Sequence, residues 1–431
     1  MSDLSQARLD SLERENRQLH RAVEELSVLN ELSIAISSSR GTDEVIRTII
    51  RRSIKAISAE QGVITLVGED ASDPTRTLVR TMASSGDREA YSPDQNLLGW
   101  MYINRKPLVV NDPKNDERFQ GVSWTESVRS LVSVPMQVHS RLIGILTLYN
   151  KKHGKDFSTE DQRLLSILGG QSAQVIETAR LYEEEKKLVT VQQELNLANE
   201  IQTNLLPLKP PDIKGYDLAG VSIPAQSVGG DYFDYIKIDD YHWGLCVGDV
   251  SGKGMPAALM MANAQATLRG QSTFGLSVHE TVERSNKLLS DSIRRGSFLT
   301  LFYGVLDVVS SVYTYSNAGH NRPYVRRADG TLETLTLGGL VVGFIGTQTY
   351  GEESFTFEPG DTLFIFSDGV TEAMNEAHDQ FEEERLEAIL KGMGDATAQE
   401  YIDRVHSAVK KHADGAAQND DITMLVVKRE N

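Results

Sequence analysis

Four aspartates stand where an apolar run meets a turn, a setting in which carboxylates can gather at the edge of a sheet. Asp231 follows two glycines, Asp249 follows HWGLCVG, Asp368 follows DTLFIFS, and Asp420, with Asp421 next to it, precedes ITMLVV. Taken singly, such an aspartate is most often a turn residue, because its side chain bonds to the nearby backbone. Four matched settings in one half of the chain favour a shared role.

The shared role that fits these acids is the binding of divalent cations. Four carboxylates at one end of a sheet repel one another, and burying them without a counter-charge is strongly unfavourable. One or two divalent cations remove that penalty. Oxygen ligands without His or Cys select hard ions such as Mg²⁺ or Mn²⁺, with Ca²⁺ also possible, over Zn²⁺.

The segments around the acids predict short strands with two inserted helices. Pro256 at a first-turn position opens a helix through PAALMMANAQATL. Ser277, with Glu280 three residues later, begins a second helix through VHETVERSNKLLSDSI. The strand candidates are HWGLCV, FLTLFYGVLD, SVYTYSNAGHN and DTLFIF. The pattern predicts an α+β domain.

The order of GGDYFDY, GDVSGKGMPAALMMA, FLTLFYGVLD, SNAGHNRP, FSDGVTEA and DDITMLVV resembles the PPM family of metal-dependent Ser/Thr phosphatases. The resemblance is to the bacterial branch of stage II sporulation and sigma-factor-regulator phosphatases, and it spans about 207–430. It implies an αββα sandwich, with two Mn²⁺ or Mg²⁺ ions between the sheets at one edge. It also implies in-line attack by a metal-activated water, with no covalent phospho-enzyme.

The resemblance assigns a role to each acid. Asp231 matches the acid of the first motif, and Asp249 matches the acid that bridges the two ions. The backbone carbonyl of Val250 would be a further ligand. Asp368 matches the acid of the SDG motif and Asp420 the first acid of the closing pair. Asp421 is then an accessory ligand or a residue that supports the others.

Residues near the motifs have less specific roles. Asp234 is predicted to be structural, and Tyr232 and Phe233 to pack in the core. His320 in NAGHN is predicted to be a structural hydrogen-bonding residue. Lys253 fits a contact to phosphate and a solvated turn equally well. Two features depart from familiar PPM patterns: the turn DVSGKG lacks the His of the eukaryotic members, and LGGLVVGFIG lacks the usual Pro.

The N-terminal part resembles a GAF domain over residues 27–182. The matching stretches are LLGWMYINRKPLVVNDPKNDERF, the predicted hairpin SVPMQVHSRLIGILTLYNKK, and FSTEDQRLLSILGGQSAQVIETARLYEE. Before them, EVIRTIIRRSIKAI predicts a helix and QGVITLV a strand. GAF domains bind small molecules or serve as dimerising sensors. A bilin tether is excluded, because the single cysteine, Cys246, lies outside this domain.

Two helical stretches flank the GAF-like domain. Residues 1–26 place Leu12, Leu19 and Leu26 at d positions and Asn16 among the a positions, which predicts a parallel two-stranded coiled coil. A lone amphipathic helix is the alternative. The GAF domain's last helix, with Thr159 and Gln162 in capping-box spacing, is predicted to continue as a linker over 183–206 until PLKPP ends it. This linker is either a signalling rod, with an apolar stripe of Leu181, Leu188, Val191, Leu195, Ala198 and Leu205, or a passive spacer.

The composition limits the partners. The 431 residues include 44 Lys plus Arg and 61 Asp plus Glu, a net charge of −17. Such an acidic surface repels phosphate backbones and anionic lipid, so nucleic acid and membranes are not expected as partners. No apolar run reaches the roughly 20 residues needed to span a bilayer, and MSDLSQARLD is no signal region. A cytoplasmic protein is expected.

These observations predict four parts: a coiled-coil helix (1–26), a GAF sensor domain (27–182), a coiled-coil linker (183–206) and a phosphatase domain (207–431). The predicted function is a homodimeric, metal-dependent protein Ser/Thr phosphatase regulated by its GAF domain, which has a possible small-molecule ligand. The resemblance implies a phosphorylated anti-sigma-factor antagonist as the substrate. The alternative is a catalytically inactive scaffold that binds a partner through the phosphatase-like domain, although all four acids are intact.

Overall fold

The computed structural model describes residues 42–67, 78–83, 91, 95–120, 122, 124–292 and 296–430. The predicted N-terminal coiled coil at 1–26 lies outside these residues. Contacts within the chain divide it into two units, Met1–Thr190 and Val191–Asn431, and helix α4 contributes residues to both. No helix in the described part of the chain is long and apolar enough to cross a bilayer.

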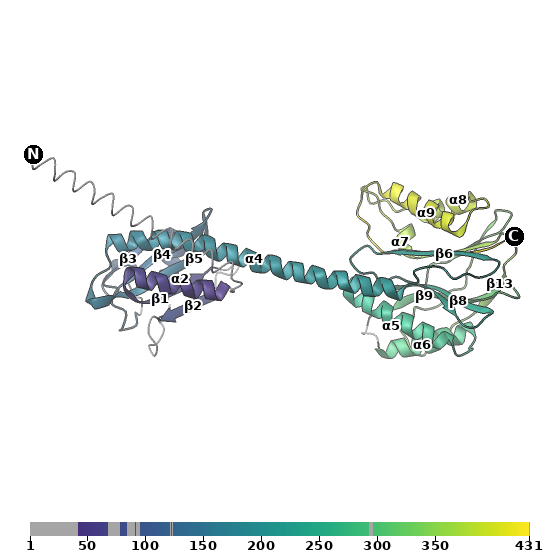
Figure 1. The fold of residues 1–431 in the computed structure, drawn as a ribbon, viewed down its shortest axis with the longest axis horizontal. Coiled ribbons are helices and arrows are strands. Elements are labelled where there is room, and N and C mark those ends of the chain that lie inside the picture. Colours follow the sequence, from purple (N-terminus) through teal and green to yellow (C-terminus); the bar gives the residue numbers. More distant parts are fainter. Residues whose placement is uncertain are drawn as a thin grey trace, which may run out of the picture. The chain divides into compact units, whose positions relative to one another are not determined.

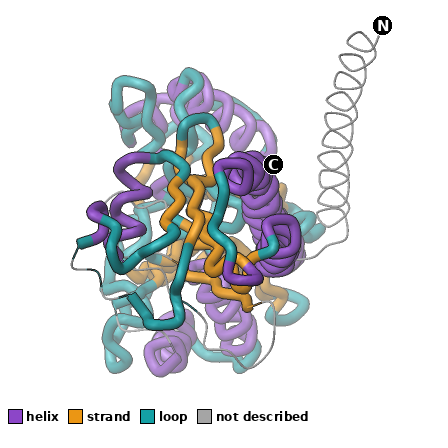
Figure 2. The backbone as a smooth tube through the Cα atoms, turned by 90° about the vertical axis from the view of Figure 1, so that its left-hand side faces the viewer, coloured by secondary structure: helices purple, strands orange, loops and turns teal. Residues whose placement is uncertain are grey.

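The N-terminal unit is an antiparallel five-stranded sheet in the order β2-β1-β5-β4-β3. Helix α2 and the first part of α4 share one hydrophobic core with the sheet, and α3 packs into a second. Figure 1 labels these helices beside the strands, and Figure 2 distinguishes helices from strands in a view turned by 90°. The predicted helix, strand and hairpin are found in α2, β1 and β4–β5. The elements are α2 Thr42–Ile57, β1 Ala59–Leu66, β2 Leu78–Ala83, α3 Gln95–Asn104, β3 Leu108–Val110, η1 Glu117–Phe119, β4 Leu131–Val138, β5 Arg141–Lys151 and η2 Lys152–Gly154.

Helix α4 runs unbroken from Thr159 to Leu205, so the predicted continuation of the GAF helix to the prolines is confirmed. Its start differs by one residue from the expected capping box. The Ser158 hydroxyl accepts from the Asp161 N–H at 3.2 Å, and the Asp161 carboxylate accepts from the Ser158 N–H at 2.9 Å. Ser158 and Asp161 therefore replace Thr159 and Gln162, because the shorter Asp reaches back to the cap while it is also held by Lys151.

The C-terminal unit is a four-layer sandwich of helices, two antiparallel sheets and helices (Figure 1), as the PPM resemblance implied. The strand orders are β13-β10-β9-β8-β7 and β12-β11-β14-β15-β6. The elements are β6 Tyr216–Ile223, β7 Tyr232–Lys237, β8 His242–Val250, α5 Met255–Ser272, α6 Val278–Ser292, β9 Leu299–Asp307, β10 Val312–Ala318, β11 Tyr324–Arg326, β12 Leu332–Thr334, β13 Glu353–Thr356, β14 Thr362–Phe366, α7 Asp368–Thr371, α8 Glu383–Lys391, α9 Ala398–Ala413 and β15 Ile422–Arg429.

Three hydrophobic cores hold the sandwich together. The central core lies between the sheets and includes Leu245, Phe302, Tyr313, Ile365 and Leu425, all essentially inaccessible to solvent. Helices α5 and α6 close the outer face of the first sheet, and α8 and α9 close that of the second. Because side chains alternate across each strand, every central strand contributes to two cores and is fixed from both sides.

Candidate metal centre between the sheets

The first sheet brings Asp231 and Asp249 to the same edge, where edge means the side of the sheet on which these strand ends lie. Asp231 immediately precedes β7, and Asp249 is the penultimate residue of β8. The antiparallel register pairs Tyr232 with Gly248, which places the two acids at one end of the hairpin. The Val250 N–H donates to the Gly230 carbonyl at 3.4 Å across the same edge.

The second sheet brings Asp368, Asp420 and Asp421 to its corresponding edge. Asp368 opens helix α7 directly after β14, and the two other acids immediately precede β15. Ser367 joins the strands, because its N–H donates to the Thr423 carbonyl and its hydroxyl accepts from the Thr423 N–H, both at 2.9 Å. The sequence-predicted acids thus come from two sheets and meet between them.

The electrostatics of this edge are unfavourable for carboxylates alone. Burial, and then the charge of Asp249, raise the pKa of Asp231 well above its usual range. Burial, followed by the charges of Asp368 and Asp420, raises the pKa of Asp249 to about 7. Burial and then Asp420 also raise the pKa of Asp368. The raised values show that nearby positive charge on the chain does not balance these three carboxylates.

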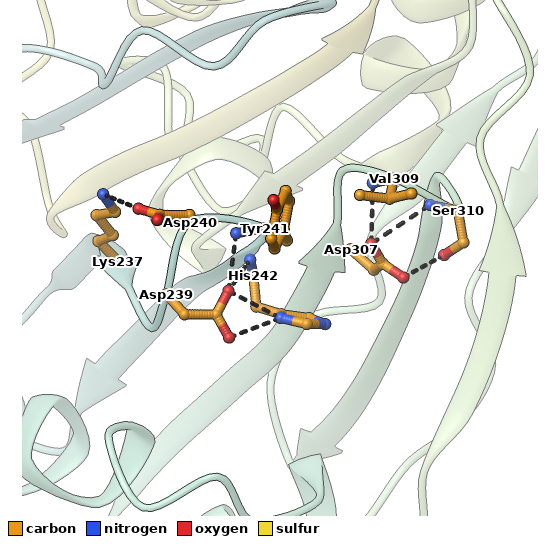
Figure 3. Close-up of polar contacts among 8 residues, drawn as sticks. All are labelled: Lys237, Asp239, Asp240, Tyr241, His242, Asp307, Val309 and Ser310. Carbon is orange, nitrogen blue, oxygen red and sulfur yellow. Dashed lines mark hydrogen bonds and ion pairs between the residues drawn. The ribbon is translucent and has the colours of Figure 1, made fainter.

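The opposite edge of the first sheet shows what satisfied aspartates look like (Figure 3). There the Asp239 carboxylate accepts from the backbone N–H groups of Tyr241 and His242 at 2.7 and 2.8 Å, and these bonds lower its pKa. The Ser310 hydroxyl bonds to Asp307 at 2.6 Å and lowers the pKa of that acid. The turn interpretation therefore holds at this edge, and the other edge needs a different explanation.

One further observation supports the binding of a hard cation by these carboxylates. Asp231 is 3% exposed, and its Oδ2 atom is buried without a hydrogen-bond partner, so a strong oxygen ligand is left unused. The described residues contain no group of three or more His, Cys, Asp or Glu side chains arranged closely enough to hold an ion as they stand. The acids share one edge but do not form a ready-made cage.

Asp420 and Asp421 are engaged by other groups. Lys253 Nζ lies 3.0 Å from Asp420 Oδ2, and Asp420 Oδ1 accepts from the Asp421 N–H at 3.0 Å. The Asp421 carboxylate accepts from the N–H groups of Ala225 and Gly230 at 2.7 and 2.6 Å. Asp421 therefore anchors the loop that carries Asp231. Lys253 pairs with a site carboxylate, a contact that the sequence analysis did not predict and that excludes neither a phosphate contact nor a solvated turn.

Two glycines permit the close approach of these segments. A Cβ at Gly229 would lie 2.6 Å from Asp421 Oδ2, and a Cβ at Gly369 would lie 2.0 Å from the Asp421 carbonyl oxygen. Both distances are shorter than van der Waals contact. Side chains at these positions would push the 225–231 loop and helix α7 away from β15, and the acids of the two sheets would separate.

The supporting residues near the motifs are placed as predicted. The Asp234 side chain is fully buried, pairs with Arg269 at 2.6 and 2.9 Å, and accepts from the Tyr232 hydroxyl at 2.7 Å. Tyr232 and Phe233 are buried in the cores on either side of the sheet. His320 Nδ1 lies 2.8 Å from the Thr300 hydroxyl, and burial lowers its pKa to about 4, so its imidazole is neutral at pH 7.

Sequence reasoning missed two contacts from α4 to the loop that carries Asp231, and in the first of them Asn199 Nδ2 donates to the Ser227 carbonyl. The buried Gln202, in the last turn of α4, donates from Nε2 to the Gly229 carbonyl at 2.6 Å and accepts at Oε1 from the Gly229 N–H at 3.0 Å. We call this pair the Gln202 clamp. Gln202 does not interrupt the helical pattern of α4, because Gln is a good helix former. The only available signal was a polar residue seven positions after Leu195 in the apolar stripe.

Comparison with solved structures identifies the fold of the C-terminal unit. The SiaA-PP2C domain of Pseudomonas aeruginosa superimposes with a TM-score of 0.51, covering 57% of this chain and 99% of that one. At 18% sequence identity this likeness shows the fold alone. The αββα sandwich is therefore the fold of the PP2C-type phosphatases.

Comparison with sequence families identifies both domains. Residues 239–430 match the family described as stage II sporulation protein E (SpoIIE), and residues 39–177 match the GAF domain family. The phosphoserine phosphatase RsbU of Bacillus subtilis is 29% identical over 253 residues, which are 58% of this chain and 75% of that protein. Protein IcfG of Synechocystis is 30% identical over 263 residues, 55% of this chain and 41% of IcfG, so the chain spans under half of IcfG.

The chain therefore combines an N-terminal GAF domain with a C-terminal Ser/Thr phosphatase domain of the SpoIIE/PP2C type, and it is homologous to RsbU. The recognition of both domains from their motifs is confirmed. The SpoIIE match includes Asp249, Asp368, Asp420 and Asp421, whereas Asp231 precedes its first residue.

Proposed function

We propose that this protein is a metal-dependent phosphoserine/phosphothreonine phosphatase that acts on a phosphorylated anti-sigma-factor antagonist and is regulated through its GAF domain. The observation that carries the catalytic part is the cluster of buried carboxylates with raised pKa values at one edge of a SpoIIE-type domain. The homology to RsbU supports a phosphoserine substrate.

Asp231, Asp249, Asp368 and Asp420, with the Val250 carbonyl, are the proposed ligands of two Mn²⁺ or Mg²⁺ ions. When bound, such ions activate a water and stabilise charge on the phosphoryl oxygens. Asp421 holds the loop at Ala225 and Gly230, which positions Asp231 without using its own oxygens on an ion. Because Lys253 pairs with Asp420, we place its ammonium group beside the reacting phosphoryl group.

The proposed regulation is supported by helix α4. Leu188 and Val191, on the apolar stripe, are 71% and 53% exposed in a single chain, which fits pairing with a second copy. Gln202 continues the same seven-residue spacing and clamps the Gly229 backbone. A change in the pairing of the two α4 helices would therefore act on the loop that carries Asp231.

The test is dephosphorylation of a panel of phosphorylated candidate proteins by the purified chain with Mn²⁺, with EDTA as the control. The proposal expects metal-dependent release of phosphate from an anti-sigma-factor antagonist. Binding of a phosphoprotein without hydrolysis, at any metal concentration, would support the inactive scaffold instead.

A further inference from the structure

A polar cavity of about 650 Å³ lies at one edge of the second sheet, outside the candidate metal centre. Its walls are the loop before β11, including His320 and Arg322, the open end of the β11–β12 hairpin, and the first turns of helix α8, with Glu383 and Glu387. The volume lies within the range of roughly 300–1,000 Å³ that is typical of ligand sites.

The cavity lies beside the candidate metal centre on the same edge of the sandwich. The strand order β12-β11-β14 places the cavity one to two strands from β14, which leads into Asp368. Neighbouring strands are about 4.8 Å apart, so the separation along the edge is roughly 5 to 10 Å. From the first sheet, Thr300 is the register partner of Asp249 and bonds to His320 in the cavity wall.

The cavity carries two charges without an ion-pair partner among the described residues. Arg322 is exposed and forms none of the ion pairs or hydrogen bonds found in that part of the chain. Glu383, on the opposite wall, likewise has no ion pair. Glu387 differs, because Lys391 and the Tyr324 hydroxyl contact it at 2.8 and 3.4 Å. The cavity thus offers one cation and one anion to an occupant.

Resting on the proposed function, we propose that this cavity is a docking subsite for the polypeptide of the phosphoprotein substrate. Arg322 binds a carboxylate side chain about two or three residues from the phosphoserine, because an extended chain advances about 3.3 Å per residue. Glu383 pairs with a neighbouring basic side chain. The subsite selects the substrate and takes no part in phosphoryl transfer.

The experiment compares kcat/KM, with Mn²⁺, for p-nitrophenyl phosphate and for two phosphoserine decapeptides. The peptides have an Ala/Gly background with Asp or Lys at the third position on both sides of the phosphoserine. The small ester cannot reach the cavity. We expect the full-length protein to prefer the Asp peptide by about three- to ten-fold, and Arg322→Glu to reverse that preference. Lys287→Glu, an equal charge change on the exposed face of α6, should keep it.

Glu383→Lys should weaken hydrolysis of a decapeptide that carries both an acid and a lysine. Glu384→Lys is the control and should have no such effect. Glu384 is exposed on the same helical turn as Glu383 but does not line the cavity. All four variants should hydrolyse p-nitrophenyl phosphate within about two-fold of the unmodified protein. Equal loss with the small ester, no discrimination between peptides, or hydrolysis of the ester but of no peptide each overturns the docking proposal. Inactivity of the unmodified protein on every substrate contradicts the proposed function instead.

Discussion

Aspartate has opposite roles at the two edges of one sheet, and its neighbours decide which. At the turn edge, backbone N–H groups and hydroxyls surround Asp239 and Asp307 and lower the pKa of each. At the other edge, burial and like charges raise the pKa of Asp231 and Asp249. The sequence identified the second group because glycines and buried strands flank each member. For any single acid the sequence favoured a turn residue over a ligand. It could not show which acids meet, since that depends on residues far along the chain.

Asp249→Asn and Asp368→Asn should each lower Mn²⁺-dependent kcat/KM on a phosphoserine substrate by at least about 100-fold, because each removes a charge that would hold the ions which stabilise the transition state. Both variants should stay folded by circular dichroism. Asp307→Asn, at the opposite edge, is the matched control and should retain activity. Near-normal turnover by either site variant at saturating Mn²⁺ would contradict the assignment.

The metal-free protein should lose stability as the pH rises from about 4 to 7. Folding raises the pKa of Asp249 from 3.8 to about 7. The stability that comes from its protonated carboxyl group is therefore fully present at pH values below the pKa of the unfolded state. This stability is lost as the pH rises through the pKa of the folded state. At about 1.4 kcal/mol per unit, the loss is at most about 4 kcal/mol. Urea unfolding in EDTA at several pH values measures it. Asp249→Asn should flatten the profile, and an unchanged slope would count against the buried charge.

At the scale of elements, the sequence predicted where helices end better than which strands pair. Helix α4 ends at Leu205 because the prolines of PLKPP cannot continue it. The pairing of β6 with β15 joins Tyr216 to Arg429, more than 200 residues apart, and no local pattern specifies such a partner. The sandwich was therefore expected from the family resemblance rather than from strand propensity. The Gln202 clamp could not be predicted either, because no local pattern shows that Gln202 contacts Gly229.

Gln202→Leu should weaken Mn²⁺ binding about ten-fold or more, with a smaller effect on kcat at saturating Mn²⁺. The substitution keeps the helix but leaves the buried N–H and carbonyl of Gly229 without partners, which costs about 1–3 kcal/mol and loosens the segment before Asp231. Titration calorimetry with Mn²⁺ reads the affinity without catalysis. Gln193→Leu, exposed on the same helix, is the control. Equal affinities for all three proteins would leave the clamp without a positioning role.

The linker should be sensitive to helical phase. Four residues inserted after Glu194 rotate the downstream stripe relative to the upstream one, whereas seven residues restore the heptad. We expect the four-residue insertion to change basal phosphatase activity several-fold and to abolish regulation, and the seven-residue insertion to preserve both. The assay compares both variants with a truncated protein that starts near Gln202. Identical behaviour of the two insertions would show that α4 is a passive spacer.

At the scale of the whole molecule, a chain with a net charge of −17 must overcome its own repulsion to pair with a second copy. The exposed stripe on α4 provides the apolar surface for that pairing, and its seven-residue spacing fits a parallel arrangement. Because the repulsion between two acidic chains is screened by salt, the dimer should tighten as ionic strength rises. The apolar stripe thus accounts for the pairing, and the screened repulsion accounts for its dependence on salt.

We therefore expect a homodimer at micromolar concentration, with twice the mass of one chain by light scattering. Leu188→Asp should shift the equilibrium towards monomer by at least about ten-fold, because it places a charge inside the paired stripe. Val189→Asp is a strict control, since Val189 is the next residue, is 50% exposed and lies off the stripe. If both substitutions weaken the dimer equally, the pairing does not use this face of α4. A monomer at every concentration and salt level would contradict the proposed dimer. It would also contradict the proposed coupling of the GAF domain to the Gln202 clamp through paired helices.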